Sequence, residues 1–192
     1  IVKVTGAELL EALEASTYCT PTSIGGFPQV SGIEFTVDTT KAYDQGEQYP
    51  GSTYYGPKSI QRVTIETVGG EPFDANATYT IATNDFMAAG GDTYYAFKAS
   101  SAQFDTGIPL DEAVMEYVTK ELKGAIGEQY AAPQGRVTYF NPFKDVKTTS
   151  WYFNYMIRLY EDGVISGTSA TTFSPDMSCT RAQIVSMLYR LR

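Results

Sequence analysis

Residues Asn84–Tyr94, NDFMAAGGDTY, combine an aromatic ring, a glycine pair and a carboxylate within one turn-sized segment. An aromatic ring such as Phe86 can stack on a flat, polarisable heterocycle. A carboxylate such as Asp92 has acceptors only and can take two hydroxyl donors at once. The preceding residues, Gly90 and Gly91, allow the backbone to approach a ligand closely. The segment therefore predicts a binding corner for a nucleotide or nucleoside.

A second ring lies in the segment GGFPQVSG, where Phe27 follows a glycine pair. Large apolar side chains in glycine-rich loops are difficult to explain as simple core residues. We therefore expect Phe27 and Phe86 to hold a base between them by stacking. Asn84 could present its amide to the edge of the base or brace the loop. In the alternative interpretation, the Gly-Gly-Asp sequence is an ordinary tight turn and Phe86 packs in the core.

Strand patterns surround these candidate residues. Period-two alternation and β-branched residues predict four strands in the first 140 residues. The predicted strands are Ile33–Asp38, Ile60–Val68, Thr78–Ala82 and Gly135–Phe140. The third strand delivers the chain into the loop that begins at Asn84. Together with two predicted helices, the four strands predict an α+β fold in which helices pack on a mixed or largely antiparallel sheet.

Two helices are expected in the same region. Thr5 and Glu8 fit a capping box at the start of the first helix. The second is predicted over Leu110–Ile126, because apolar residues repeat there on one helical face. Residues 39–59 form a connection that is longer than most loops within a compact domain. This connection could be a functional flap or a variable surface excursion.

These segments carry a resemblance to a known family. NDFMAAGGDTY, GGFPQVSGIEFTVD and GRVTYF resemble the C-terminal substrate-binding domain of the 5′-nucleotidase family, which includes UDP-sugar hydrolases and 2′,3′-cyclic phosphodiesterases. The resemblance covers residues 1–140. It implies that Phe27 and Phe86 form the base clamp and that Asp92 accepts the ribose hydroxyls. Pro28 stands where the family usually has an aliphatic residue, a difference that could tilt the Phe27 ring.

Catalytic residues are not expected in this chain. The sequence contains no histidine, whereas the resemblance implies a dinuclear centre with His, Asp and Asn ligands, and imidazole is a common ligand of such metals. We expect divalent metal ions in a catalytic domain that lies outside this chain. The arginines that the family uses for phosphate would precede Ile1. We therefore interpret residues 1–140 as an N-terminally truncated domain with an incomplete pocket.

A second module is predicted at residues 143–192, after Pro142. Its segments FKDV, WY, LYEDGVISGT, TTFSPD and TRAQ resemble, in this order, a single S-layer homology (SLH) repeat. Periodic apolar residues predict two helices. The first carries Tyr152, Tyr155 and Met156 on one face, and the second follows a capping box of Thr180 and Gln183.

The second module also contains candidate ligand contacts. The SLH resemblance implies binding to an anionic secondary polymer of the bacterial cell wall, with Trp151 and Arg181 as the candidate residues. A cation in the first helical turn opposes the helix dipole, which favours a ligand role for Arg181. One repeat of about 50 residues buries little core. We therefore expect neighbouring repeats or packing between chains.

Composition argues against some partners. Asp and Glu total 22 against 14 Lys and Arg, and the resulting net charge of −8 repels the phosphates of a nucleic acid polymer. No apolar run is long enough to span a bilayer. Cys19 and Cys179 lie one in each module. A disulfide is permitted at a cell surface, but we expect both cysteines to be free.

The sequence is compatible with two functions. The chain could be the nucleotide- or nucleoside-recognition part of a secreted, wall-anchored phosphoesterase of the 5′-nucleotidase type. It could instead be a non-catalytic binding or structural module of the cell surface, anchored by SLH repeats. Both hypotheses place it outside the cell, at the bacterial surface or cell wall. A metallophosphatase domain upstream would favour the first.

Overall fold

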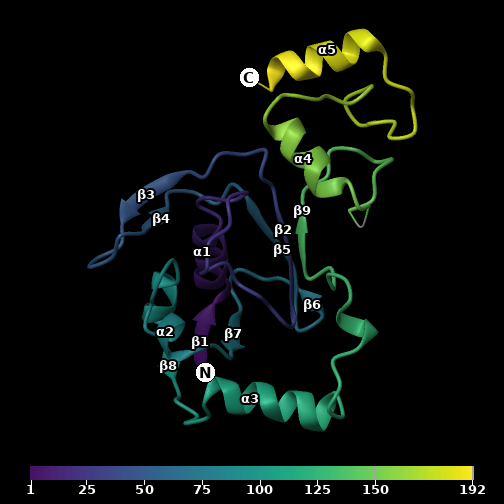
Figure 1. The fold of residues 1–192 in the computed structure, drawn as a ribbon. Helices are drawn as coiled ribbons and strands as arrows, with labels where there is room; N and C mark the ends of the chain where they lie inside the picture. The colour runs from purple at the N-terminus through teal and green to yellow at the C-terminus, as the bar shows by residue number, and fades with distance from the viewer. Residues whose placement is uncertain (149, 192) are drawn as a thin grey trace.

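The first module is built on two β-sheets in the computed structural model, which describes residues 1–148 and 150–191 (Figure 1). One antiparallel sheet has the order β7-β1-β8, formed by Thr78–Ile81, Val2–Thr5 and Ala102–Gln103. The other has the order β6-β5-β2-β9, formed by Glu71–Pro72, Val63–Val68, Ile33–Val37 and Val137–Tyr139. Strand β9 runs parallel to β2, whereas the other pairs in this sheet are antiparallel. The predicted α+β class with a mixed sheet is confirmed.

Helix α1 (Gly6–Ser16) contacts strands of both sheets. Its capping box is present: the Thr5 hydroxyl accepts the Glu8 N–H at 3.2 Å, and the Glu8 carboxylate accepts the Thr5 N–H at 2.7 Å. Leu9 and Leu13 project from α1 into the core, where they join the inward-facing residues of β2 and β5. The core therefore lies beneath the loops that carry the candidate binding residues.

A buried carboxylate fixes α1 to the start of β5. Glu14 is fully buried and accepts hydrogen bonds from the backbone N–H groups of residues 61–63, at 2.8 to 3.1 Å. Arg62 is also buried, and its guanidinium donates to the backbone carbonyls of Lys41, Thr17 and Thr20. Burial lowers the pKa of Arg62, and the Glu14 charge opposes that shift. These bonds fix both ends of the long connection that precedes β5.

That connection contains a hairpin, β3 (Gln45–Gln48) and β4 (Tyr55–Pro57). Tyr49 anchors it: the side chain is buried, its ring stacks on Tyr95 with centroids 4.7 Å apart, and its hydroxyl donates to Glu11 at 3.1 Å. The hairpin is therefore held against α1 and against the chain that follows the Asn84 loop.

The predicted helix over Leu110–Ile126 is wrong in extent. Helix α3 covers Leu110–Glu116 and continues only as a π-helical turn, Tyr117–Glu121, before positive φ angles at Lys123 and Gly124 end it. None of the residues in these two segments is buried. The apolar residues that predicted the helix are not buried by the described part of the chain, and α3 lies away from the two sheets (Figure 1).

The second module contains α4 (Phe153–Glu161) and α5 (Arg181–Arg190). Its small core contains Phe143, Val146, Phe153, Met156 and Ile157. The predicted α4 face is partly wrong, because Tyr155 is 69% exposed. The predicted capping box of α5 is present, but no residue of α5 is buried. The modules meet where Tyr139 packs against both cores and where the Thr39 hydroxyl donates to the Glu161 carboxylate.

Candidate functional site

A cavity of about 780 Å³ opens above the core of the first module. Four of the predicted binding residues line it: Phe27, Asn84, Phe86 and Asp92. Phe27 comes from the loop between α1 and β2, whereas the other three come from the segment after β7. Gly90 and Gly91 do not line the cavity. The fold thus brings together two segments that lie about sixty residues apart in the sequence.

The two aromatic rings differ in burial. Phe27 is half-buried and packs against the core, whereas Phe86 in α2 (Asp85–Ala88) is 54% exposed. The alternative in which Phe86 is a core residue does not fit this exposure. An exposed ring at the edge of a cavity leaves one face free for stacking on a ligand.

Asn84 and the glycine pair shape the loop. The Asn84 side chain is the N-cap of α2 and accepts the Met87 N–H at 2.7 Å, so its oxygen braces the loop. The N–H of Gly90 bonds to the Met87 carbonyl and that of Gly91 to the Phe86 carbonyl, both at 2.9 Å. With Gly90 at φ +82°, this is a Schellman ending, which requires a left-handed residue. The glycines therefore turn the chain so that Asp92 faces the cavity.

The Asp92 carboxylate lies against the other loop of the site. A methyl group on Gly26 would stand 2.8 Å from Asp92 Oδ2, so any side chain there would have to displace the carboxylate. The Tyr94 hydroxyl donates to the Gly26 carbonyl at 2.6 Å. Burial raises the pKa of Tyr94, and the charge of Asp92 adds to the shift. Tyr94 therefore fixes the glycine loop at close contact with Asp92.

Two further tyrosines near Asp92 were not predicted from the sequence. Tyr18 and Tyr54 form an edge-to-face pair with centroids 5.7 Å apart. The negative charge of nearby Asp92 raises the pKa of Tyr54, and burial adds to the shift. Neither tyrosine belongs to a local sequence motif. Tyr54 lies in the connection of residues 39–59, for which the sequence allowed either a functional flap or a variable surface loop. Only the fold brings them beside Asp92.

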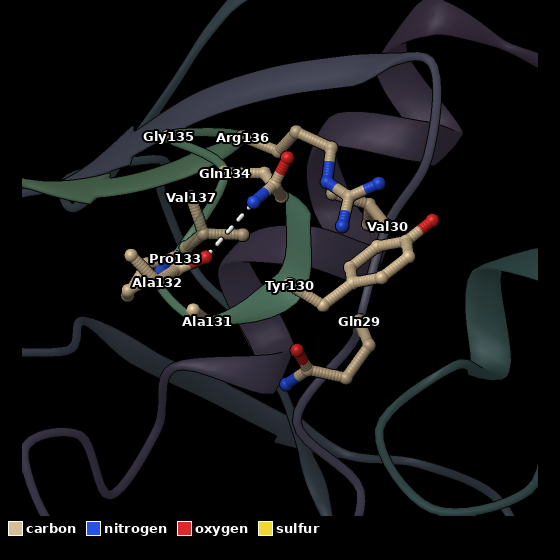
Figure 2. A pocket seen from close by; sticks show the side chains of 10 residues that line it. All are labelled: Gln29, Val30, Tyr130, Ala131, Ala132, Pro133, Gln134, Gly135, Arg136 and Val137. Carbon is tan, nitrogen blue, oxygen red and sulfur yellow. Dashed lines mark hydrogen bonds between the residues drawn. The ribbon is translucent and has the colours of Figure 1, made fainter. Parts of the chain in front are cut away.

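A smaller cavity of about 400 Å³ adjoins the first and shares Gln29 and Val30 with it. Arg136 is the residue before β9, and Figure 2 shows its guanidinium extending toward the ring of Tyr130. The Tyr130 hydroxyl shares a hydrogen bond of 2.8 Å with Tyr117 at the end of α3. The GRVTYF segment thus supplies a wall of this second cavity.

The candidate wall-binding residues lie apart from these cavities. Trp151 is 85% exposed and meets Tyr152 edge-to-face at 5.5 Å. Arg181 is the first residue of α5 and is exposed. Within residues 1–148 and 150–191, no hydrogen bond or ring contact joins the two side chains, so the structure does not unite them in one site.

Metal-binding groups, disulfides and membrane-spanning helices are each absent from the same described residues. The described part of the chain holds no group of three or more His, Cys, Asp or Glu side chains that could bind a metal ion. Cys19 and Cys179 are both free thiols. None of the described helices has the length and apolar character needed to cross a membrane.

Comparison with known families matches both modules. The model of the family described as 5′-nucleotidase, C-terminal domain, matches residues 1–99. The model of the S-layer homology domain matches residues 142–185. The two matches follow each other along the chain, in the order expected from the sequence motifs.

Individual relatives agree with these matches. The chain is 32% identical over 154 residues to the trifunctional nucleotide phosphoesterase protein YfkN of Bacillus subtilis. This match covers 79% of this chain and 9% of that protein. It is 30% identical over 140 residues to the cell wall protein Lmo0130 of Listeria monocytogenes, covering 72% of this chain and 15% of the relative. A crystal structure of a 5′-nucleotidase precursor from Thermus thermophilus superposes with a TM-score of 0.55 at 30% identity, over 73% of this chain and 24% of that one. The chain therefore spans less than a quarter of each of these three proteins.

Proposed function

Because this chain belongs to the family of 5′-nucleotidase C-terminal domains, we propose that residues 1–140 recognise the base and sugar of a nucleotide or nucleoside. One observation carries the proposal: Phe27 from one segment, and Asn84, Phe86 and Asp92 from another, line a single cavity of about 780 Å³. The cavity is large enough for a small-molecule ligand. Its aromatic and acidic groups match the chemistry of a nucleoside.

Each residue has a separate role in this proposal. Phe27 and Phe86 stack on the two faces of the base, an interaction worth about 1 to 3 kcal/mol per stacked base in proteins that bind single strands. Asp92 accepts hydrogen bonds from the sugar hydroxyls. The Asn84 oxygen caps α2, so its amide nitrogen is the group left to donate to the base. Gly90 and Gly91 hold the loop in shape without contacting the ligand.

We further propose that this domain positions substrate for a phosphoesterase. The relative from Bacillus subtilis is named as a nucleotide phosphoesterase, which supports that reaction class. Divalent metal ions would activate water for attack on phosphorus, and we place them in a catalytic domain outside this chain. The residues described here would bind and orient the nucleoside part.

The S-layer homology domain places the protein at the cell surface or cell wall, outside the cell. We propose that this domain binds a secondary polymer of the wall. Exposed Trp151 can stack on sugar rings, and Arg181 can pair with carboxylate or phosphate groups. The nucleoside site would then be fixed at the surface.

Calorimetric titration of adenosine and AMP into the full chain tests the nucleoside site. We expect saturable binding that Phe86→Ala weakens about tenfold or more, as loss of one stacked ring implies. Phe104→Ala is the matched control, since that ring is 66% exposed and lies outside the cavity. Equal losses in the two variants would contradict the base clamp. Absence of binding to the unmodified chain would favour the alternative, a surface module without nucleotide recognition.

A further inference from the structure

The smaller cavity, of about 400 Å³, has a cation in its wall and no acid. Arg136 is the one charged side chain among the described residues that line it. The chain as a whole carries a net charge of −8. A cavity with a positive wall in so acidic a chain indicates an anion as its ligand.

The guanidinium of Arg136 is free to bind such an anion. Among residues 1–148 and 150–191 it makes no ion pair and no hydrogen bond, although the residue is half-buried. Arg62 differs, because three backbone carbonyls accept bonds from its buried guanidinium. A partly desolvated cation without a partner has an energetic cost that a bound anion would offset.

The sheet holds the backbone of Arg136 at the cavity. The Arg136 carbonyl accepts the Phe35 N–H at 2.9 Å, and the next residue, Val137, begins the parallel pairing of β9 with β2. The side chain extends from this fixed point toward the ring of Tyr130, which lines the same cavity (Figure 2). Arg136 therefore presents its donors at a defined place.

The loop before Arg136 is braced by bonds of its own. The Gln134 amide group donates to the carbonyls of Gln129 and Ala132. The hydroxyls of Tyr130 and Tyr117 share a bond of 2.8 Å. These bonds shape the wall without the guanidinium, which leaves Arg136 available for a ligand.

We propose that the smaller cavity is an anion site that binds a phosphate group through Arg136. The planar fork of a guanidinium matches two phosphate oxygens, and such hydrogen bonds are charge-assisted. Gln29, from the loop before β2, has an amide that makes no hydrogen bond within the described residues, so it is available to a third oxygen. A phosphate has oxygens for both groups, whereas a carboxylate has two in all.

Two sources supply this chemistry. The cavity adjoins the larger one at Gln29 and Val30, so the phosphate can belong to a nucleotide whose nucleoside part lies in the larger cavity. It can also be inorganic phosphate that binds by itself. The anion site does not require that the larger cavity bind a nucleoside.

Arg136→Gln in the full chain tests the site, because it removes the charge and the fork. Arg136→Lys keeps the charge and removes the fork alone. Lys58→Gln is the matched control, since Lys58 is exposed and lines neither cavity. Each chain is titrated with inorganic phosphate, AMP and adenosine, and NMR of the backbone amides locates the bound ligand. Thermal unfolding checks that each variant is folded.

We expect phosphate to shift the amide signals of residues 129–137 saturably. Arg136→Gln should weaken this binding about tenfold or more, as loss of charge-assisted hydrogen bonds implies. Arg136→Lys should recover part of the affinity, and Lys58→Gln should change it little. If the phosphate belongs to a nucleotide, Arg136→Gln also weakens AMP binding and leaves adenosine binding unchanged. If it is free phosphate, the variant affects neither AMP nor adenosine.

The proposal is overturned if neither phosphate nor AMP binding depends on Arg136. An equal loss in Lys58→Gln would also overturn it, because the attraction would then be a general charge effect. So would equal weakening of AMP and adenosine without any response to phosphate, since Arg136 would then shape the larger cavity. Failure of adenosine to bind would count against the proposed nucleoside site alone, because phosphate binding is measured separately.

Discussion

The ring of Phe86 stands directly over Gly91. A methyl group at Gly91 would lie 2.5 Å from Cζ of the ring and 2.6 Å from both Cε atoms. The backbone N–H of Gly91 also donates to the Phe86 carbonyl at 2.9 Å, which holds the two residues together. The orientation of the ring at the mouth of the cavity therefore depends on the absence of a side chain at Gly91.

Gly91→Ala should separate ligand binding from stability. The exposed Phe86 ring can swing away from the new methyl group, so we expect the free energy of unfolding to change by less than about 1 kcal/mol. The displaced ring no longer stacks on a base, and adenosine binding should weaken about tenfold or more. Calorimetric titration and urea unfolding measure the two effects.

A double-mutant cycle identifies the cause. In the Phe86→Ala background, Gly91→Ala should add no further loss of binding, because the ring that it displaces is already gone. A similar loss in both backgrounds would show that Gly91 acts through the backbone turn instead.

Much of this architecture could be predicted from local sequence patterns. The alternation of Ile33, Phe35 and Val37 predicted β2 to within one residue of its observed end, and both capping boxes form as expected. These predictions succeed because strand alternation and N-cap bonds involve residues within a few positions of each other. The sequence also marked the segments whose rings and acid line the cavity, although their roles in ligand binding stay predictions.

The failures concern relationships across the chain. Tyr54 comes near the charge of Asp92 only in the folded chain, and no local sequence pattern marks that proximity. The helix predicted over Leu110–Ile126 had the right period, but the left-handed residues Lys123 and Gly124 end it early. Periodicity also does not indicate which element packs on an apolar face. The apolar face of α3 stays exposed among the described residues.

Glu14→Gln should destabilise the first module strongly. The buried carboxylate accepts three successive backbone N–H groups, and an amide nitrogen in place of one oxygen would face a donor. Loss of one charged hydrogen bond with an unsatisfied buried donor predicts a cost of about 2 to 3 kcal/mol. Urea unfolding followed by circular dichroism measures it. Glu112→Gln on exposed α3 removes the same charge and should cost little; equal effects would contradict a structural role for Glu14.

Arg181→Gln should weaken binding to cell-wall preparations that carry an anionic polymer. Loss of one charge-assisted contact predicts about a three- to tenfold reduction in affinity, and added salt should reduce the difference. Cosedimentation with purified walls, before and after chemical removal of the polymer, measures it. Lys147→Gln removes one positive charge from the same module. If it weakens binding as much as Arg181→Gln does, the attraction is a general charge effect.

The contact between the modules contains a titrating group. Burial raises the pKa of Glu161, and the positive charges of Arg158 and Arg62 oppose the shift without cancelling it. A carboxyl group whose pKa is higher in the folded state binds its proton more tightly there. Its contribution to stability is therefore full below its unfolded pKa of about 4.5 and is lost as the pH rises through the folded value.

Glu161→Gln should remove this pH dependence. The amide oxygen of the variant can still accept the Thr39 hydroxyl, so the hydrogen bond between the modules is kept. We expect the variant to resemble the unmodified chain near pH 4 and to be at least as stable at pH 7, where the native carboxylate is ionised at a partly buried position. Thermal unfolding across pH 4 to 7 measures the difference, with Glu71→Gln on exposed β6 as the control for losing one negative charge. The variant could instead lose stability, relative to the unmodified chain, as the pH rises from 4 to 7. That result would mean that attraction to Arg62 and Arg158 outweighs the cost of burying the charge of Glu161.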